Sequence, residues 1–164
     1  PSASGRFSTE MPDQLLLDAM LGKLATYLRM CGYDAAYVLD SVDDPTAGPT
    51  DDGILAEARE PGRTILTRDR ELAARADNAL CLRSREVEDQ LSELRTAGYS
   101  LSLDSTPTRC GACNGPVRAV GAGEPVPDYA PDPAETDCWR CEDCEQVFWK
   151  GSHWDDVAST LAAV

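Results

Sequence analysis

Two pairs of cysteines have a spacing that is typical of metal binding. Cys110 and Cys113 form one CxxC segment, and Cys141 and Cys144 form another. Each segment places two thiolates on one tight turn, and two such turns supply the four soft ligands that a structural Zn²⁺ prefers. Because four thiolates leave no open position for water or a substrate, we expect a structural zinc site within a zinc ribbon.

A fifth cysteine leaves one alternative open, because Cys138 and Cys141 have the same spacing. We favour the pair with Cys144, since Glu142 and Asp143 are typical of a turn and Cys138 lies in a strand-like run. The chain has seven cysteines, and CxxC pairs suit a reducing compartment better than a disulfide framework. We therefore expect no disulfides and a cytoplasmic protein.

Three aspartates occupy positions from which they could bind a second kind of metal. Asp18 follows the apolar run 15–17, Asp69 follows a predicted strand at 64–67, and Asp51 begins a predicted helix. The carboxyl ends of parallel strands form the ligand crevice of an open sheet, and carboxylates that converge there repel one another unless a divalent cation neutralises them. Mg²⁺ or Mn²⁺ at such a site activates water for phosphodiester hydrolysis. The structural alternative is that Asp51 is an ordinary helix N-cap in a chain with 18 aspartates.

The elements that must position these residues alternate between strands and helices. Hydrophobic spacing predicts strands over 15–17, 33–39, 64–67 and 79–82, with helices over 18–31, 51–60, 71–76 and 87–97. Such alternation predicts an α/β fold whose parallel sheet is covered by helices on both faces.

The composition changes to Cys, Gly, Pro and aromatic residues after Pro107, which predicts a second module. We expect a tail over 1–10, an α/β domain over 11–105, and a zinc ribbon with a C-terminal helix over 106–164. Ser152 and Asp155 fit a capping box for that helix.

Acidic residues dominate the charge of the chain. Asp and Glu number 29 against 15 Lys and Arg, so the formal charge is −14, and only two residues are lysine. Dispersed acids with few lysines are typical of a surface adapted to concentrated salt, so we hypothesise a halophilic source. No run of about eighteen apolar residues is present, and we expect no membrane association.

Three segments together resemble the Mut7-C RNase family over nearly the whole chain from Leu15. They are LLLDAMLGKLATYLRMCGYDA, then DDGILAEAREPGRTILTRDRELAARA, and finally WRCEDCEQVFWKGSHW. The resemblance implies a PIN-like nuclease domain followed by a zinc ribbon, and it implies metal-dependent cleavage of RNA. The family tends to have an aromatic residue where this chain has Cys138, which supports leaving Cys138 out of the zinc shell.

Matched position by position, the resemblance implies that Asp18, Asp51 and Asp69 are the Mg²⁺ or Mn²⁺ ligands. Asp52 adjoins Asp51 and is the alternative to it. PIN domains commonly use a further acid, for which the candidates are Asp40, Asp43 and Asp44.

Basic residues are also implied. Lys23 and Arg68 match basic positions within the family motifs and are candidate phosphate contacts. His153 is the lone histidine, and we interpret it as an RNA or inter-module contact rather than a catalytic residue.

The preferred function is therefore a divalent-metal-dependent ribonuclease, and specifically an endonuclease. One alternative is a non-catalytic RNA- or protein-binding module that uses the zinc ribbon. A second alternative is another metal-dependent hydrolase, such as a phosphatase or a DNA nuclease, that uses the same acids.

Overall fold

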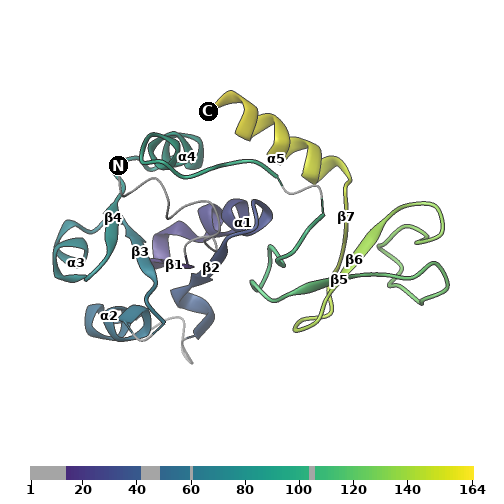
Figure 1. The fold of residues 1–164 in the computed structure, drawn as a ribbon, viewed down its shortest axis with the longest axis horizontal. Coiled ribbons are helices and arrows are strands. Elements are labelled where there is room, and N and C mark those ends of the chain that lie inside the picture. Colours follow the sequence, from purple (N-terminus) through teal and green to yellow (C-terminus); the bar gives the residue numbers. More distant parts are fainter. Residues whose placement is uncertain (1–13, 42–48, 60, 104–105) are drawn as a thin grey trace, which may run out of the picture.

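Four short parallel strands form the main sheet, in the order β2-β1-β3-β4 (Figure 1). The protein is described by a computed structural model that covers residues 14–41, 49–59, 61–103 and 106–164. The strands of this sheet are β1 (Gln14–Leu17), β2 (Asp34–Tyr37), β3 (Thr64–Thr67) and β4 (Ala79–Cys81). The helices are η2 (Ala19–Leu21), α1 (Gly22–Met30), η3 (Val38–Ser41), α2 (Asp51–Arg59), α3 (Arg70–Arg75), α4 (Val87–Thr96) and α5 (Ser152–Ala163).

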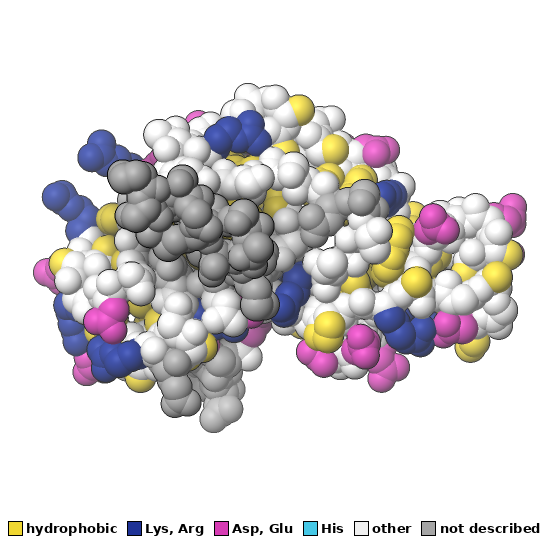
Figure 2. Space-filling model, viewed as in Figure 1, with side chains coloured by type: hydrophobic (Ala, Val, Ile, Leu, Met, Phe, Trp, Pro, Cys, Tyr) yellow, Lys and Arg dark blue, Asp and Glu magenta, His cyan; other side chains and the backbone are white. Residues whose placement is uncertain are grey.

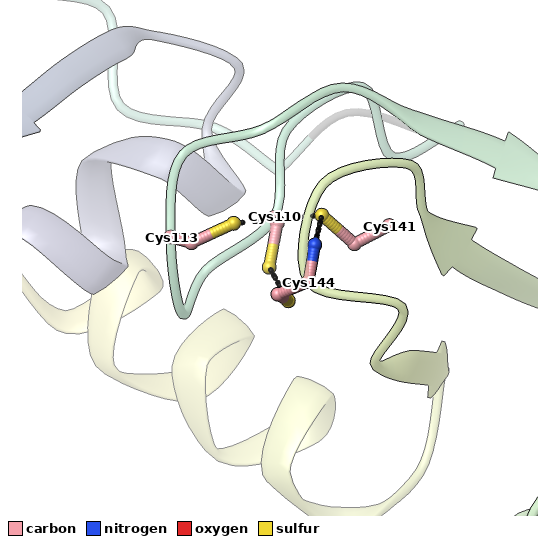
Figure 3. Close-up of side chains that lie close together, drawn as sticks. All are labelled: Cys110, Cys113, Cys141 and Cys144. Carbon is pink, nitrogen blue, oxygen red and sulfur yellow. Dashed lines mark hydrogen bonds between the residues drawn. The ribbon is translucent and has the colours of Figure 1, made fainter.

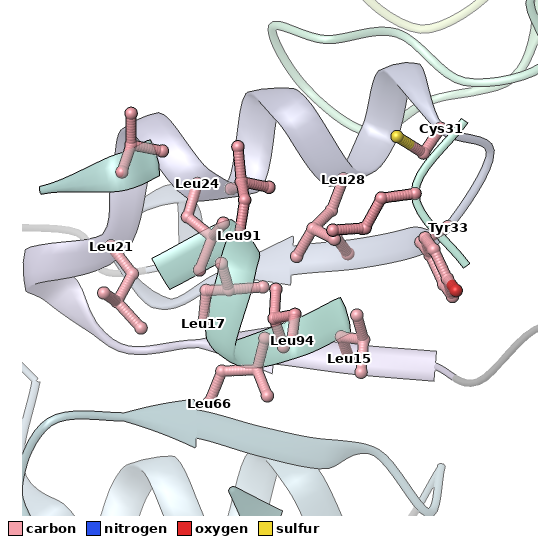
Figure 4. Close-up of a cluster of buried hydrophobic side chains, with 14 of the residues drawn as sticks. Leu15, Leu17, Leu21, Leu24, Leu28, Cys31, Tyr33, Leu66, Leu91 and Leu94 are labelled. Carbon is pink, nitrogen blue, oxygen red and sulfur yellow. The ribbon is translucent and has the colours of Figure 1, made fainter. Parts of the chain in front are cut away.

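Helices cover both faces of this sheet, which confirms the predicted fold class. Successive residues of β1 point to opposite faces, so Leu15 and Leu17 belong to one hydrophobic cluster and Leu16 to another. The first cluster joins the sheet to α1, α4 and α5, as Leu24, Leu28, Leu91 and Leu94 show in Figure 4. The second cluster joins the sheet to α2 and α3. The unbroken apolar run of β1 thus reflects burial on both sides.

The strand order changes direction at β1, which lies between β2 and β3 in the sheet. From β1 the chain moves to β2 on one side, and it then returns to β3 on the other side of β1. Open α/β sheets bind ligands outside the carboxyl ends of strands at such a point. The edge formed by the ends of β2, β1 and β3 is called the carboxyl edge below.

A second, antiparallel sheet is formed by β5 (Val117–Ala119), β6 (Cys138–Cys141) and β7 (Val147–Trp149), called the ribbon sheet below. The final helix leaves this sheet and returns to the first one. Val157 and Leu161 of α5 are buried in the same cluster as Leu91 of α4. The last helix of the predicted C-terminal unit therefore packs in the core of the α/β layer (Figure 1).

Two local predictions are wrong. Val38 and Leu39 begin the 3-10 helix η3 instead of extending the strand. The predicted capping box also fails, because Gly151 is the N-cap of α5 and its carbonyl accepts from the amide of Asp155 at 3.1 Å. Gly151 has a steric reason to be glycine, since a Cβ atom there would lie 2.7 Å from the indole nitrogen of Trp149.

Asp34, the first residue of β2, joins the two sheets through a partly buried polar network. Its carboxylate accepts hydrogen bonds from Arg63 at 2.9 Å and from Asn114 at 2.7 Å, and Arg109 lies 3.7 Å away. Asn114 belongs to the first cysteine turn, and its side chain also accepts from the amide of Ala35 at 3.0 Å. The ribbon is therefore attached to the outer strand of the main sheet.

Replacing Asp34 with Asn should destabilise the chain by about 2 kcal/mol at pH 7, because two arginines lose a largely buried partner. Burial opposes ionisation of Asp34, but its hydrogen bonds to Arg63 and Asn114 and the neighbouring arginine charges hold its pKa below the ordinary value. A lowered pKa stabilises the fold above about pH 4, and this stabilisation is lost as the pH falls through the folded-state pKa. Urea unfolding at pH 7 and pH 3 measures both effects.

The matched control is Asp77→Asn, which removes an exposed ion pair with Arg59. That change should alter stability by less than about 0.5 kcal/mol. Equal effects of the two substitutions, or a difference that does not shrink at pH 3, would contradict the role given to Asp34.

Among the described helices, none is long and apolar enough to cross a membrane.

Candidate functional site

Four thiol groups meet between the two cysteine turns (Figure 3). Cys110 and Cys113 lie on the loop before β5, and Cys141 and Cys144 lie at the turn between β6 and β7. The sulfur of Cys110 is 3.7 Å from that of Cys144, and the sulfurs of Cys113 and Cys141 are 3.5 Å apart. Tetrahedral zinc with bonds of about 2.3 Å requires sulfur separations of about 3.8 Å. The four-cysteine group can therefore hold a metal ion such as zinc.

Both turns have the backbone geometry that orients thiolates toward an ion. The amide of Ala112 points at the sulfur of Cys110 at 3.3 Å, and the amide of Asp143 points at that of Cys141 at 3.4 Å. The residue after the second cysteine has positive φ in each turn, at 73° for Asn114 and 66° for Glu145. The two turns are thus near-copies of one another, although only the first carries a glycine next to the left-handed residue.

The pKa values of these thiols differ between the two turns, and binding of a cation must displace their protons. Burial raises the pKa of Cys110 and of Cys113, so these groups resist ionisation on their own. Burial acts in the same direction on Cys141, but amide donors from Cys144 and Asp143 more than offset it and lower its pKa to about 7. A divalent ion that displaces the protons compensates the cost of the buried thiolates.

Cys138 lies outside this group, as the preferred pairing predicts. It faces the opposite way within β6, where its thiol contacts the carbonyls of Thr136 at 3.3 Å and of Pro131 at 3.8 Å. It packs with Val120 and Val147 in the small core of the ribbon sheet. The alternation of side chains along β6 therefore separates Cys138 from Cys141.

Asp18 and Asp69 lie together on the carboxyl edge, linked by one hydroxyl group. The carboxylate of Asp18, which is 7% exposed, accepts from the hydroxyl of Thr67 at 2.6 Å and from the amide of Ala19 at 2.7 Å. The same hydroxyl of Thr67 accepts from the amide of Asp69 at 2.9 Å. The carboxylate of Asp69 caps α3 by accepting from the amides of Glu71 and Leu72. The ends of β1 and β3 thus hold two carboxylates in fixed orientations.

Asp40 brings a third acid to the same edge from the end of β2. Burial raises the pKa of Tyr37, and the charges of Asp40 and Asp18 raise it further, so both carboxylates act electrostatically on that phenol. Tyr37 donates to the carbonyl of Ala19 at 2.5 Å, and Arg29 holds the carboxylate of Asp40 at 3.2 Å. Of the three candidates for a further acid, Asp43 and Asp44 lie outside the described residues.

Asp51 and Asp52 have a different partner. Asp52 forms a short ion pair with Arg75 at the end of α3, and Asp51 lies 3.9 Å from the same guanidinium. The helix is capped by Thr50, whose hydroxyl accepts from the amide of Gly53 at 3.0 Å. The metal-binding role expected for Asp51 therefore stays a prediction, and it requires that carboxylate to leave Arg75.

Within the described part of the chain, only the four cysteines place three or more ligand atoms within 4.8 Å of one another. The aspartates therefore do not form a closed cage. An octahedral ion such as Mg²⁺ does not need one, because it keeps several waters and uses only one or two carboxylates. The donor set at the edge fits such an ion, since all of its groups are oxygen ligands.

Two of the three predicted basic contacts lie at the carboxyl edge, and the third lies beside the ribbon. Lys23 is exposed in the first turn of α1, which begins at the carboxyl edge. Arg68 lies between Thr67 and Asp69 at the end of β3. His153 instead lines a hollow of about 340 Å³ between α1 and the ribbon, together with Trp139, Trp149 and Trp154.

Two features of the edge were not specified by the sequence. The hydroxyl of Thr67 donates to the carboxylate of Asp18 and accepts from the backbone amide of Asp69, and its only sequence signal is its place as the last residue of a strand before Asp69. Arg70 and Arg83 line a hollow beside Arg68, and no sequence spacing links α3 to the residues after β4.

Comparison with known proteins gives one match. A family model described as Mut7-C RNAse domain matches residues 13–161. No curated protein and no solved structure matches the chain.

Proposed function

Since the chain belongs to the Mut7-C RNAse domain family, we propose that it is a divalent-metal-dependent endoribonuclease that hydrolyses RNA phosphodiesters on the carboxyl edge. The family indicates a ribonuclease-type function, and the metal dependence is our inference from the site. The observation that supports it most directly is the pair of carboxylates at the ends of adjacent strands, where Thr67 orients that of Asp18 and the amides of Glu71 and Leu72 orient that of Asp69. Oriented oxygen ligands beside a switch in strand order, of which that of Asp18 is buried, suit a metal-assisted hydrolase.

The residues of the carboxyl edge would have two roles, metal binding and contact with the RNA backbone. Asp18, Asp69 and Asp40 would hold Mg²⁺ or Mn²⁺, with Asp51 as a further ligand. When bound, such an ion supplies a water of lowered pKa and stabilises negative charge on the phosphate. Thr67 keeps the Asp18 carboxylate in one rotamer through its hydroxyl group. Lys23 and Arg68 would contact phosphate oxygens of the RNA strand.

The four cysteines would hold a structural Zn²⁺ that maintains the ribbon. The first cysteine turn also contacts α1, because the carbonyl of Gly111 accepts from Thr26 at 3.3 Å and from Arg29 at 3.2 Å. Arg29 is 3% exposed and also binds the carboxylate of Asp40. Zinc would therefore support the edge indirectly, through the turn that Arg29 contacts.

Cleavage should require a hard divalent ion at the carboxyl edge, whereas zinc at the four cysteines contributes only indirectly. We expect the purified chain to cleave single-stranded RNA in Mg²⁺ or Mn²⁺, and to lose at least about 100-fold of that rate in Ca²⁺, which does not support the octahedral geometry. Gel electrophoresis of a labelled RNA measures the rate of cleavage. Internal fragments on the same gel identify endonucleolytic products. A panel with DNA and a phosphate monoester separates a ribonuclease from other hydrolases, and equal rates without added ion would contradict the proposal.

A non-catalytic RNA-binding module is the second candidate, and the aromatic hollow beside His153 favours it. Trp139, Trp149 and Trp154 line this hollow, and aromatic faces bind unpaired bases by stacking. Lys150 lies 5.3 Å from the ring centroid of Trp154. RNA binding without turnover in either ion, with fluorescence quenching of tryptophan, would favour this candidate over the nuclease.

A further inference from the structure

Three arginines surround a hollow next to the carboxyl edge. Arg68 follows β3, Arg70 begins α3, and Arg83 follows β4, and with Cys81 and Leu82 they line a space of about 480 Å³. This volume lies within the range of ordinary ligand sites. Because Arg68 precedes Asp69 directly, the hollow adjoins the proposed reaction site.

Six other arginines of the chain form ion pairs with carboxylates. In contrast, no carboxylate of the described residues lies within 4.0 Å of the guanidinium groups of these three arginines. The buried Nε of Arg68 has no hydrogen-bond acceptor in the part of the chain that the structure describes. Arg70 and Arg83 are exposed. In a chain with 29 acids and 15 bases, three unpaired arginines around one hollow form a local excess of positive charge.

The neighbouring acids form no ion pair with these arginines among the described residues, although the charge of Arg83 contributes to the lowered pKa of Glu93. Asp69 uses its carboxylate to cap α3, and Glu93 accepts from the amides of Arg83 and Ser84 rather than from the arginine side chain. In Figure 2, Lys and Arg side chains protrude around the end of the molecule that carries α3 and β4, where Asp and Glu side chains also lie among them. The basic groups are thus available to an anionic ligand.

We propose that this arginine hollow binds backbone phosphates of a single-stranded RNA segment next to the phosphate that is cleaved. The inference rests on the proposed ribonuclease function. Guanidinium groups recognise phosphate through paired N–H donors and retain their charge at any working pH. Binding there would offset the repulsion between RNA and an acidic protein close to the aspartates, where RNA must approach. Contacts to the backbone position the strand without selecting its sequence.

Affinity for RNA tests the proposal independently of cleavage. Arg70→Gln/Arg83→Gln, made in an Asp18→Asn chain so that RNA stays intact, should weaken binding of a labelled single-stranded RNA at least about 10-fold in fluorescence anisotropy. Each lost phosphate contact on a single strand reduces the slope of log affinity against log salt by about 0.7, so the slope should fall by about 1.4. Circular dichroism before titration checks that the fold is retained.

Arg59→Gln is the matched control, because Arg59 is exposed but lies at the far end of α2 in an ion pair with Asp77. It should leave affinity and slope nearly unchanged. If the double substitution leaves both unchanged, or if Arg59→Gln weakens binding equally, the arginine hollow is not the phosphate site. A wild-type chain that binds RNA through these arginines but does not cleave it in Mg²⁺ or Mn²⁺ would refute the proposed function and, with it, the placement beside a cleaved phosphate, leaving the arginine hollow as an RNA-binding site alone.

Discussion

Asp18→Asn should lower the rate of RNA cleavage by about 1000-fold, which corresponds to about 4 kcal/mol of transition-state stabilisation. The carboxylate of Asp18 is nearly buried, and both of its oxygens accept hydrogen bonds that hold it at the end of β1. Asparagine has the same shape and keeps one carbonyl oxygen as an acceptor, so the protein should stay folded. The substitution removes the negative charge of the carboxylate, which a divalent ion requires from its ligand. Single-turnover cleavage of a labelled RNA at saturating protein measures the effect apart from binding.

Matched substitutions of other aspartates locate the effect. Asp69→Asn should reduce the rate similarly, whereas Asp77→Asn, in an exposed ion pair before β4, should not change it. Asp51 and Asp52 of α2 both pair with Arg75, so the structure does not choose between them as a metal ligand. Asp51→Asn and Asp52→Asn distinguish them, because only the substitution of the true ligand should lower the rate. Full activity of purified Asp18→Asn would remove the carboxyl edge as the reaction site.

The sequence predicted those elements whose signal is local. Leu15, Leu16 and Leu17 form an unbroken apolar run because β1 is buried on both faces, and Gly32, Gly62 and Gly98 end elements with positive φ. The two CxxC turns were also predictable, because each needs only four consecutive residues. Local spacing was sufficient wherever one turn or one strand determines the geometry.

Long-range arrangement was not predictable from local patterns. Strand order depends on which side of β1 each crossover takes, and no periodicity in the chain records that choice. The return of α5 to the core beside α4 depends on contacts about 70 residues apart, such as Arg95 with the carbonyl of Val164. Asp40 could not be selected from its acidic neighbours, because its role depends on its proximity to Tyr37 and Arg29.

The acidic surface and the ribonuclease function are compatible because one group of arginines outside the described ion pairs lies beside the proposed reaction site. Several arginines of the chain are held in ion pairs with carboxylates, as Arg63 is with Asp34 and Arg118 is with Glu124. The arginine hollow keeps its positive charge next to the aspartates that would hold the metal. A general excess of acid would then slow nonspecific association with RNA but oppose correct binding less strongly.

Cys144→Ser should release the metal and loosen the ribbon, whereas Cys138→Ser should keep the metal. Cys144 is one of the four sulfurs that can surround an ion, and its loss leaves three thiols whose burial then disfavours the charged forms. Binding of zinc to such sites is coupled to folding with free energies of about 10 kcal/mol or more, so loss of one ligand should cost several kcal/mol. Elemental analysis of zinc per chain and thermal unfolding measure the two effects.

The paired Cys138→Ser change is the control, because it replaces one small thiol in the ribbon core without touching the four-sulfur group. Equal loss of zinc from both variants would overturn the assignment of the fourth ligand.

Cys144→Ser should also reduce RNA cleavage by about 10-fold in Mg²⁺, a smaller loss than for Asp18→Asn. The reason is that Arg29 contacts both the carbonyl of Gly111 in the first cysteine turn and the carboxylate of Asp40. A turn that no longer holds zinc would release one contact of Arg29 and, through it, the orientation of an acid on the carboxyl edge.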